Sequence, residues 1–160
     1  MVHCIGGIMS FSFLQVSWFE KRKELKQIRE RVFVCEYHIP KHIEFDNHDR
    51  DCQHLLVIDE QGKSVATARV SKSGIISRVA VLAPYRTNEF YRQMFQQIAE
   101  YIEALGAREV SFNCKLTEKE KFTECGYLPC GHVFMEAGIA RQKLTCPLSN
   151  FDPEPFTLVH

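Results

Sequence analysis

The sequence lacks the features by which several classes of protein are recognised. No apolar run approaches the ~20 residues that a membrane-spanning helix needs, and residues 1–13 contain no basic cluster of the kind that begins a signal peptide. Lysine plus arginine and aspartate plus glutamate both number 20, so no net charge draws the chain toward nucleic acid or an anionic membrane. We therefore expect a cytoplasmic protein that binds neither nucleic acid nor membranes.

The cysteines and histidines also lack the spacing of a metal site or a disulfide framework. The seven cysteines are scattered and never spaced as C-x-x-C. Pro40 interrupts the helical i, i+4 geometry that a ligand pair His38 and His42 would need. We expect no metal, and cysteines of which most are reduced and several are simply buried.

What the sequence does contain is the composition of one ordinary globular domain. The chain has 160 residues, of which 45% are apolar and 25% charged. A chain of this length buries roughly 70% of its unfolded surface, enough for one core. We predict a single domain over residues 1–146 and an extended tail over residues 147–160, which contain Pro153 and Pro155.

Hydrophobic periodicity predicts an alternation of strands and helices. We predict strands at residues 11–16, 55–59, 65–70, 75–82, 109–114, 132–136 and 140–145, and helices at about 17–32, 86–106 and 117–126. Residues 38–51 are predicted to be an irregular polar crossing segment. The S/T-x-x-E spacing predicts capping boxes at residues 17–20 and 117–120.

The order of these elements predicts an α/β (α+β) fold. Three sequential strands between residues 55 and 82 favour an antiparallel meander. A long helix between two strands implies a right-handed parallel crossover. We therefore predict a mixed, mostly antiparallel central sheet flanked by helices.

Three short segments carry a resemblance to a known family. Residues 28–36 read IRERVFVCE, residues 46–55 contain Asp46, Asp49 and the pair His54-Leu55, and residues 136–139 read EAGI. In this order they resemble the L-R-x-x-V-F-V-x-E segment, the acidic crossing loop and the E-x-G-I turn of the ElaA-like branch of the GNAT N-acetyltransferase superfamily. The resemblance covers residues 25–144. It implies the single GNAT fold, with a V-shaped opening between the strand that ends at Leu82 and the strand at Val110.

The resemblance implies acetyl-CoA as co-substrate. In this family the loop [QR]-x-x-G-x-[GA] opens the long helix and binds the diphosphate through backbone N–H groups. Here the loop reads RTNEFY, with Glu89 and Tyr91 at the two small-residue positions, which indicates a degenerate diphosphate loop. The cofactor-binding residues that the resemblance implies are Val79, Ala80, Val81, Arg86, Thr87, Asn88, Glu89, Phe90, Tyr91 and Asn113.

Glu89 leaves two alternatives open. A carboxylate about 6 Å from one phosphate charge would cost about 2.8 kcal/mol at an effective dielectric constant of about 20, roughly a hundredfold in affinity. Turned outward, the same carboxylate would stabilise the first turn of the helix.

The candidate catalytic residues also lie on the segments that resemble this family. Many GNAT enzymes protonate the leaving thiolate with a tyrosine four residues before a glycine, but that position here is Phe122, before Gly126. We identify Glu136 and Glu36 as candidate bases. His54 and Asp46 are further candidates, and each of the four residues also has a structural interpretation, such as an ion pair between Glu36 and an arginine.

The function that follows is transfer of an acetyl group from acetyl-CoA to the amine of a small acceptor by direct attack. A catalytically degenerate GNAT-fold protein that binds a ligand or a protein is the alternative. A third interpretation is transfer of a longer acyl chain from acyl carrier protein, as in acyl-homoserine lactone synthases. Cys114 at a strand end is read as a buried cysteine rather than a nucleophile, and a homodimer is left open.

Overall fold

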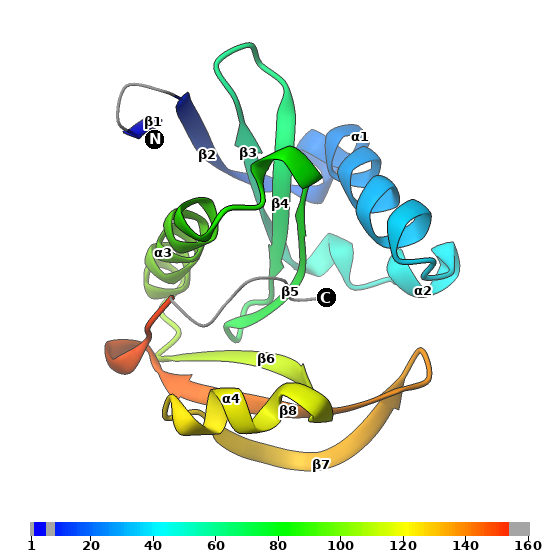
Figure 1. The fold of residues 1–160 in the computed structure, drawn as a ribbon, viewed down its shortest axis with the longest axis vertical. Helices are drawn as coiled ribbons and strands as arrows, with labels where there is room; N and C mark the ends of the chain where they lie inside the picture. Colours follow the sequence, from blue (N-terminus) through cyan, green and yellow to red (C-terminus); the bar gives the residue numbers. More distant parts are fainter. Residues whose placement is uncertain (1, 6–8, 154–160) are drawn as a thin grey trace.

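The computed structural model describes residues 2–5 and 9–153, which contain one eight-stranded sheet in the order β1-β2-β3-β4-β5-β6-β8-β7 (Figure 1). The strands are β1 (Val2–Ile5), β2 (Met9–Ser17), β3 (Gln53–Ile58), β4 (Ser64–Val70), β5 (Ile75–Val81), β6 (Glu109–Lys115), β7 (Leu128–Glu136) and β8 (Ile139–Pro147). Only β5 and β6 pair in parallel among these strands, and every other pair is antiparallel. The predicted fold class, with its meander and its parallel crossover, is confirmed.

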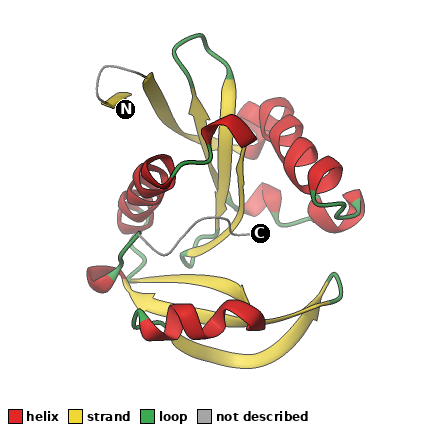
Figure 2. Ribbon diagram, viewed as in Figure 1, coloured by secondary structure: helices red, strands yellow, loops and turns green. Residues whose placement is uncertain are grey.

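Helices cover both faces of the sheet (Figures 1 and 2). The α-helices are α1 (Trp18–Arg29), α2 (Lys41–Glu44), α3 (Asn88–Ala104) and α4 (Lys119–Glu124), and a π-helical segment (Glu30–Glu36) continues α1. Apolar residues of α1, among them Leu25 and Ile28, form one buried cluster with Leu56 and Ala80 of the sheet. On the opposite face, α3 and α4 pack on the larger cluster, which contains Phe90, Met94, Ile98, Ile102 and Phe122. The periodicity read from the sequence therefore identified the buried face of α3.

The two predicted capping boxes have different outcomes. At the first, Ser17 Oγ accepts from the N–H of Glu20 at 3.2 Å, and Glu20 Oε1 accepts from the N–H of Ser17 at 3.1 Å. The second prediction is wrong, because a 3₁₀ turn (Leu116–Glu118) precedes α4 and the helix begins at Lys119 without a side-chain cap. Thr117 is the middle residue of that turn, and Glu118, not Thr117, directly precedes the helix.

Other boundaries also differ from the prediction. The helix predicted to reach residue 32 is α-helical only to Arg29, because the hydrogen bonds then widen into the π-helical segment. The predicted irregular segment 38–51 contains α2 and a 3₁₀ turn (Asp49–Asp51). β1 was not predicted at all, and β7 begins at Leu128 rather than at residue 132.

The sheet divides where β5 leaves β6. These strands pair only at Ile75 with Ser111 and at Ile76 with Phe112, and then diverge. Two residues after Ile76, Arg78 has a φ of 53° and lies beside a register shift between β4 and β5. A bulged, left-handed residue bends a strand, and Figure 2 shows β6, β7 and β8 turned away from the end of β5. The predicted V-shaped opening is confirmed.

The start of the predicted tail packs against the domain. The N–H of Leu148 donates to the carbonyl of Arg108 at 2.8 Å, and Leu148 and Phe151 contact the larger apolar cluster. Residues 154–160 lie outside the described residues, and the domain boundary at residue 147 stays a prediction. Across the described chain, no helix is both long and apolar enough to span a membrane.

Candidate active site

A buried network of charged side chains fastens the segment 38–51 to β4 and β5. We call it the ion network; its members are Arg29, Glu44, Asp46, Asp49, Arg69 and Arg78. Arg29 is fully buried and donates to Glu44 Oε2 and to Asp49 Oδ1, each at 2.7 Å. Because breaking one partner out of a buried ion pair costs about 3–5 kcal/mol, the network fixes this segment firmly.

Asp46 stands at the edge of the network. It accepts from Arg69 Nη1 at 2.7 Å and from Arg78 Nη2 at 3.2 Å. Burial opposes its ionisation, but the hydrogen bond and the charge of Arg69 outweigh that effect and lower the pKa of Asp46. Asp46 is therefore a structural anion that holds two arginines in place.

His54 lies behind the network. Its ring stacks at a tilt on Trp18 with 5.5 Å between centroids, and its Nε2 is 3.0 Å from the carbonyl oxygen of Asp49. Because a carbonyl only accepts, Nε2 carries the proton. Burial lowers the pKa of His54, so the ring is neutral near pH 7. His54 supports the acidic crossing segment and does not line the pocket described next.

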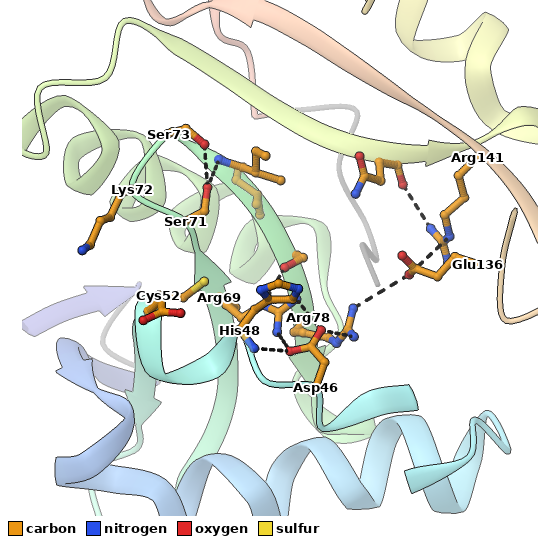
Figure 3. Close-up of a pocket in the computed structure, with 15 residues that line it drawn as sticks. Asp46, His48, Cys52, Arg69, Ser71, Lys72, Ser73, Arg78, Glu136 and Arg141 are labelled. Atoms are coloured by element: carbon orange, nitrogen blue, oxygen red, sulfur yellow. Dashed lines mark hydrogen bonds and ion pairs between the residues drawn. The ribbon is translucent and has the colours of Figure 1, made fainter. Parts of the chain in front are cut away.

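The main pocket has a volume of about 640 Å³ and lies at the narrow end of the opening, where β5 and β6 last pair at Ile76 (Figure 3). Glu136, the last residue of β7, contributes a carboxylate to its wall. Glu136 Oε1 is 4.0 Å from Arg78 Nη1 and 3.8 Å from Arg141 Nε, both beyond hydrogen-bond distance. Among the described residues nothing donates a hydrogen bond to this carboxylate, which is therefore available to a ligand.

A second, smaller pocket continues into the opening. Its volume is about 160 Å³, its lining includes Phe33, Tyr37 and Phe122, and it shares Asn113 and Arg141 with the main pocket. The ring of Phe122 packs edge-on against Phe112, with 4.7 Å between centroids. The residue that replaces the family's tyrosine therefore faces this apolar pocket as a packed ring without a transferable proton.

Cys114 lines the same pocket but is not activated. Burial raises the pKa of its thiol to about 11, and the thiol donates to the carbonyl of Lys115 at 3.2 Å. A thiol in this state is a poor nucleophile. The structural interpretation of Cys114 is favoured.

The predicted diphosphate loop lies at the start of α3, where Arg86 and Glu36 form an ion pair. Arg86 donates to the two Glu36 oxygens at 2.7 and 2.5 Å, and its Nε donates to the carbonyl of Val81 at 2.9 Å. The hydrogen bonds from Arg86 lower the pKa of Glu36. Beside the pair is a pocket of about 360 Å³ that Arg31 and Lys63 also line. Three cations, Arg31, Lys63 and Arg86, therefore line the pocket beside the loop, although the loop lacks the glycines.

Neither Glu89 nor Tyr91 lines this pocket. The Glu89 carboxylate turns along α3 to Arg92, with the closest contact at 2.5 Å, and those hydrogen bonds lower its pKa. Tyr91 is 5% exposed, belongs to the larger apolar cluster, and burial raises its pKa to about 12. Thr87 Oγ1 caps the N–H of Phe90 at 3.1 Å. No described residue accepts from the N–H groups of Asn88 and Glu89, so the helix start retains two free donors for an anion.

Comparison with known proteins identifies the family of this chain. Residues 28–111, more than half of the chain, match the family described as Acetyltransferase (GNAT) domain. The chain belongs to the GNAT acetyltransferase family. The predicted superfamily is thereby confirmed.

GNAT relatives are found by sequence and by structure. The uncharacterised protein YyaT of Bacillus subtilis (strain 168) is 28% identical over 132 residues, which cover 79% of this chain and 88% of YyaT. A putative N-acetyltransferase from Lactobacillus plantarum superposes with a TM-score of 0.71 at 21% identity, covering 86% of this chain and 98% of its own. Escherichia coli ElaA superposes with a TM-score of 0.66 at 23% identity, covering 84% and 98%. These structures show that the GNAT fold is shared.

The GNAT fold gathers the predicted site residues into two groups. Glu136 and Asn113 line the main pocket, whereas Glu36 and Arg86 line the pocket beside the loop, so the two candidate bases share no pocket. Phe90 is buried and packs its ring against Phe11 at 5.0 Å.

The three strand residues of the predicted cofactor site are all buried. Leu82 donates its N–H toward β4, and the carbonyl of Val81 meets Arg86 on the opposite side. Because backbone groups alternate along a strand, the N–H and C=O groups of Val79 and Val81 point toward the opening, and those of Ala80 point toward β4.

Sequence reasoning missed the arginines of the main pocket. Arg69, Arg78 and Arg141 are each less than a tenth exposed and line its wall. A signal was present, because Arg78 is the one charged residue in the mostly apolar strand of residues 75–82, and a buried charge requires a partner or a function.

Proposed function

We propose that this protein transfers an acetyl group from acetyl-CoA to the amine of a small acceptor by direct attack. Membership of the GNAT family supports acyl transfer. The observation that carries the proposal is the Glu136 carboxylate, which accepts no hydrogen bond from the described residues and lines the pocket at the narrow end of the opening. A carboxylate in this state can orient an ammonium group and accept its proton.

The chemistry assigns each part of the opening a role. The amine enters the main pocket and loses a proton to Glu136. Its nitrogen attacks the thioester carbonyl, the new carbon–nitrogen bond forms, and the carbon–sulfur bond breaks. The leaving thiolate takes its proton from solvent, because Phe122 has none to give. The apolar lining around Phe122 excludes water from the reacting carbonyl.

Acetyl-CoA fits the two ends of the opening. Val79 presents its backbone groups to the pantetheine arm, and Arg86, Arg31 and Lys63 supply positive charge near the start of α3. The free N–H groups of Asn88 and Glu89 add donors for the diphosphate. This arrangement compensates for the missing glycines of the loop.

Glu36 is a weaker candidate for the base than Glu136. Its carboxylate is occupied by Arg86 on both oxygens, and Arg86 lowers its pKa. We propose that Glu36 instead pairs with Arg86 in the unliganded protein and releases it when the phosphates of acetyl-CoA bind.

The alternative, a GNAT-fold binding protein without catalysis, is favoured by one contact. Arg86 Nε occupies the carbonyl of Val81, one of the backbone groups that the pantetheine arm would use. Transfer of longer chains from acyl carrier protein stays a prediction.

Calorimetric titration with acetyl-CoA and an assay of free thiol test the proposal together. Glu136→Gln keeps the shape and removes the base, and we expect kcat/KM to fall by about 10²- to 10⁴-fold with the Kd for acetyl-CoA unchanged. Glu103→Gln, on the exposed side of α3, is the matched control. Absence of acetyl-CoA binding at millimolar concentration would refute the enzyme and leave the binding protein.

A further inference from the structure

The strand β7 forms one edge of the sheet, and most of its side chains are exposed. Within the described chain it is the last strand of the order and pairs only with β8 (Figure 1). Three of its exposed side chains are large and apolar, with Leu128 64%, Val133 51% and Met135 66% exposed. The strand contains no lysine. An edge strand with apolar side chains and no lysine is a template for pairing with a further strand.

The backbone of β7 offers hydrogen-bonding groups over its second half. Glu136 precedes a two-residue turn to β8, and the residues that flank such a turn bond to each other. Because backbone groups alternate along a strand, Val133 and Met135 direct theirs away from β8. Pro129 and the register shift that follows it limit regular pairing in the first half. The segment that can accept another strand is therefore residues 132–136.

This segment, HVFME, is complementary to itself in one antiparallel register. In it Phe134 lies opposite its own copy, as an aromatic pair. Val133 then lies opposite Met135, and these are the two residues whose backbone groups point outward and bond. His132 lies opposite Glu136, so the only carboxylate of the segment faces a histidine and not a second carboxylate. Aromatic and apolar cross-strand pairs stabilise paired strands, and like charges directly opposite would oppose the pairing.

Other registers and other edges fit less well. A register centred on Met135 runs into the turn, where Ala137 has a φ of 52°. A register centred on Val133 places Met135 opposite Gly131, which has no side chain and a φ of 84°. Pairing of β7 with β1, the other edge, would leave a free edge on each copy and build an open fibre. Pairing of β7 with itself about a two-fold axis closes.

We propose that the protein forms a homodimer in which residues 132–136 of two copies pair antiparallel about a two-fold axis at Phe134. Two sheets then continue into one through β7. The inference is independent of the proposed acyl transfer. Because the pairing segment is short and small interfaces are transient, we expect a Kd on the order of 10–100 μM and a monomer at lower concentrations.

Sedimentation velocity of the full-length wild-type chain tests the dimer. We expect the mass to rise from that of a monomer toward that of a dimer between about 5 and about 500 μM, without larger species. A chain that stays monomeric at the highest concentration overturns the proposal, and so does one that grows beyond a dimer.

Two double variants test the register. Val133→Lys with Met135→Lys places lysine opposite lysine on both flanks, and we expect association to weaken by about 30-fold or more. Val133→Lys with Met135→Glu places lysine opposite glutamate, and we expect a Kd within about fivefold of the wild-type value. Both positions are more than half exposed in the monomer, so the new charges stay in water there. Phe19→Lys, at a 73% exposed position on α1, is the control and should leave association unchanged.

The two double variants must differ. A dimer that persists with two lysines forms through another surface, and loss of the dimer in both variants rejects the register, because registers centred on Val133 or Met135 set like charges against each other in both. Circular dichroism checks that the variants are folded.

Hydrogen exchange on the wild-type protein gives a readout that needs no variant. The amides of Val133 and Met135 should exchange about threefold or more slowly at about 500 μM than at about 5 μM, because pairing protects them. Equal exchange at both concentrations contradicts the proposal.

Discussion

The ion network and the Arg86–Glu36 pair are both built from arginines and carboxylates, yet they differ in burial and in number of partners. Arg29 is fully buried and bonded to two carboxylates, whereas Arg86 and Glu36 have side chains 23% and 40% exposed and depend mainly on each other. Exposed pairs contribute about 0–1 kcal/mol, and a broken buried pair costs several times more. The network is therefore part of the fold, and the exposed pair can rearrange when a ligand arrives.

The largest effect should come from breaking the network. Arg29→Met leaves Glu44 and Asp49 without their main partner, and we expect the free energy of unfolding to fall by about 3–5 kcal/mol. Arg31→Met, two residues along, changes an exposed arginine that makes no ion pair with the described residues, and it should change the free energy of unfolding by less than about 0.5 kcal/mol. Urea denaturation measures both, and equal effects would remove the distinction between the two regions.

The next-largest expected effect is the dependence of folding stability on pH that His54 causes. Burial lowers the pKa of His54 in the folded protein. At a pH between the folded and the unfolded pKa, the unfolded chain therefore binds a proton at His54 and the folded chain does not. The stability from the neutral ring is complete above the unfolded pKa of about 6.5 and is lost as the pH falls below it toward the folded pKa. The slope approaches at most about 1.4 kcal/mol per pH unit.

His54→Gln should flatten that slope, and the exposed His132→Gln should leave it unchanged. Denaturation midpoints between pH 5 and 7.5 provide the measurement. A wild-type stability that is level across this range would show that His54 accepts a proton in the folded state.

A smaller effect is expected from opening the exposed pair. Glu36→Gln frees Arg86 for phosphate, and we expect acetyl-CoA to bind up to about fivefold more tightly. If Glu36 were instead the catalytic base, kcat would fall by about 10²-fold or more. Calorimetry and thiol release on one variant therefore separate the two roles.

The smallest effect belongs to Glu89. Its carboxylate lies along α3 against Arg92, so Glu89→Gln should change acetyl-CoA affinity by less than about twofold. The sequence alone allowed a repulsion of roughly a hundredfold. A large gain in affinity for this variant would mean that the carboxylate turns into the site when acetyl-CoA binds.

Local and pairwise patterns were predictable from the sequence. The capping box at Ser17, the buried face of α3 and the parallel crossover follow from spacing that spans one turn or one element. The second capping box failed because its residues fit two local structures, a 3₁₀ turn and a helix cap, and packing chose the turn.

The candidate site was only partly predictable. Glu136 and Asn113 were named and lie in the main pocket, but Arg78 and Arg141 were not. They come from β5 and β8, 63 positions apart, and only the divergence of β5 from β6 brings their side chains to one carboxylate. No periodicity within either strand encodes that meeting.

The sequence by itself determined the family, the order of the main elements and the buried faces of α1 and α3, because hydrophobic burial follows the period of each element. The tertiary structure alone decided that Glu89 pairs with Arg92, that Tyr91 enters the core, and that Arg141 is left with a free donor. These outcomes depend on the direction each side chain takes among neighbours distant in the chain. That direction is set by packing and charge pairing, which a linear pattern does not contain.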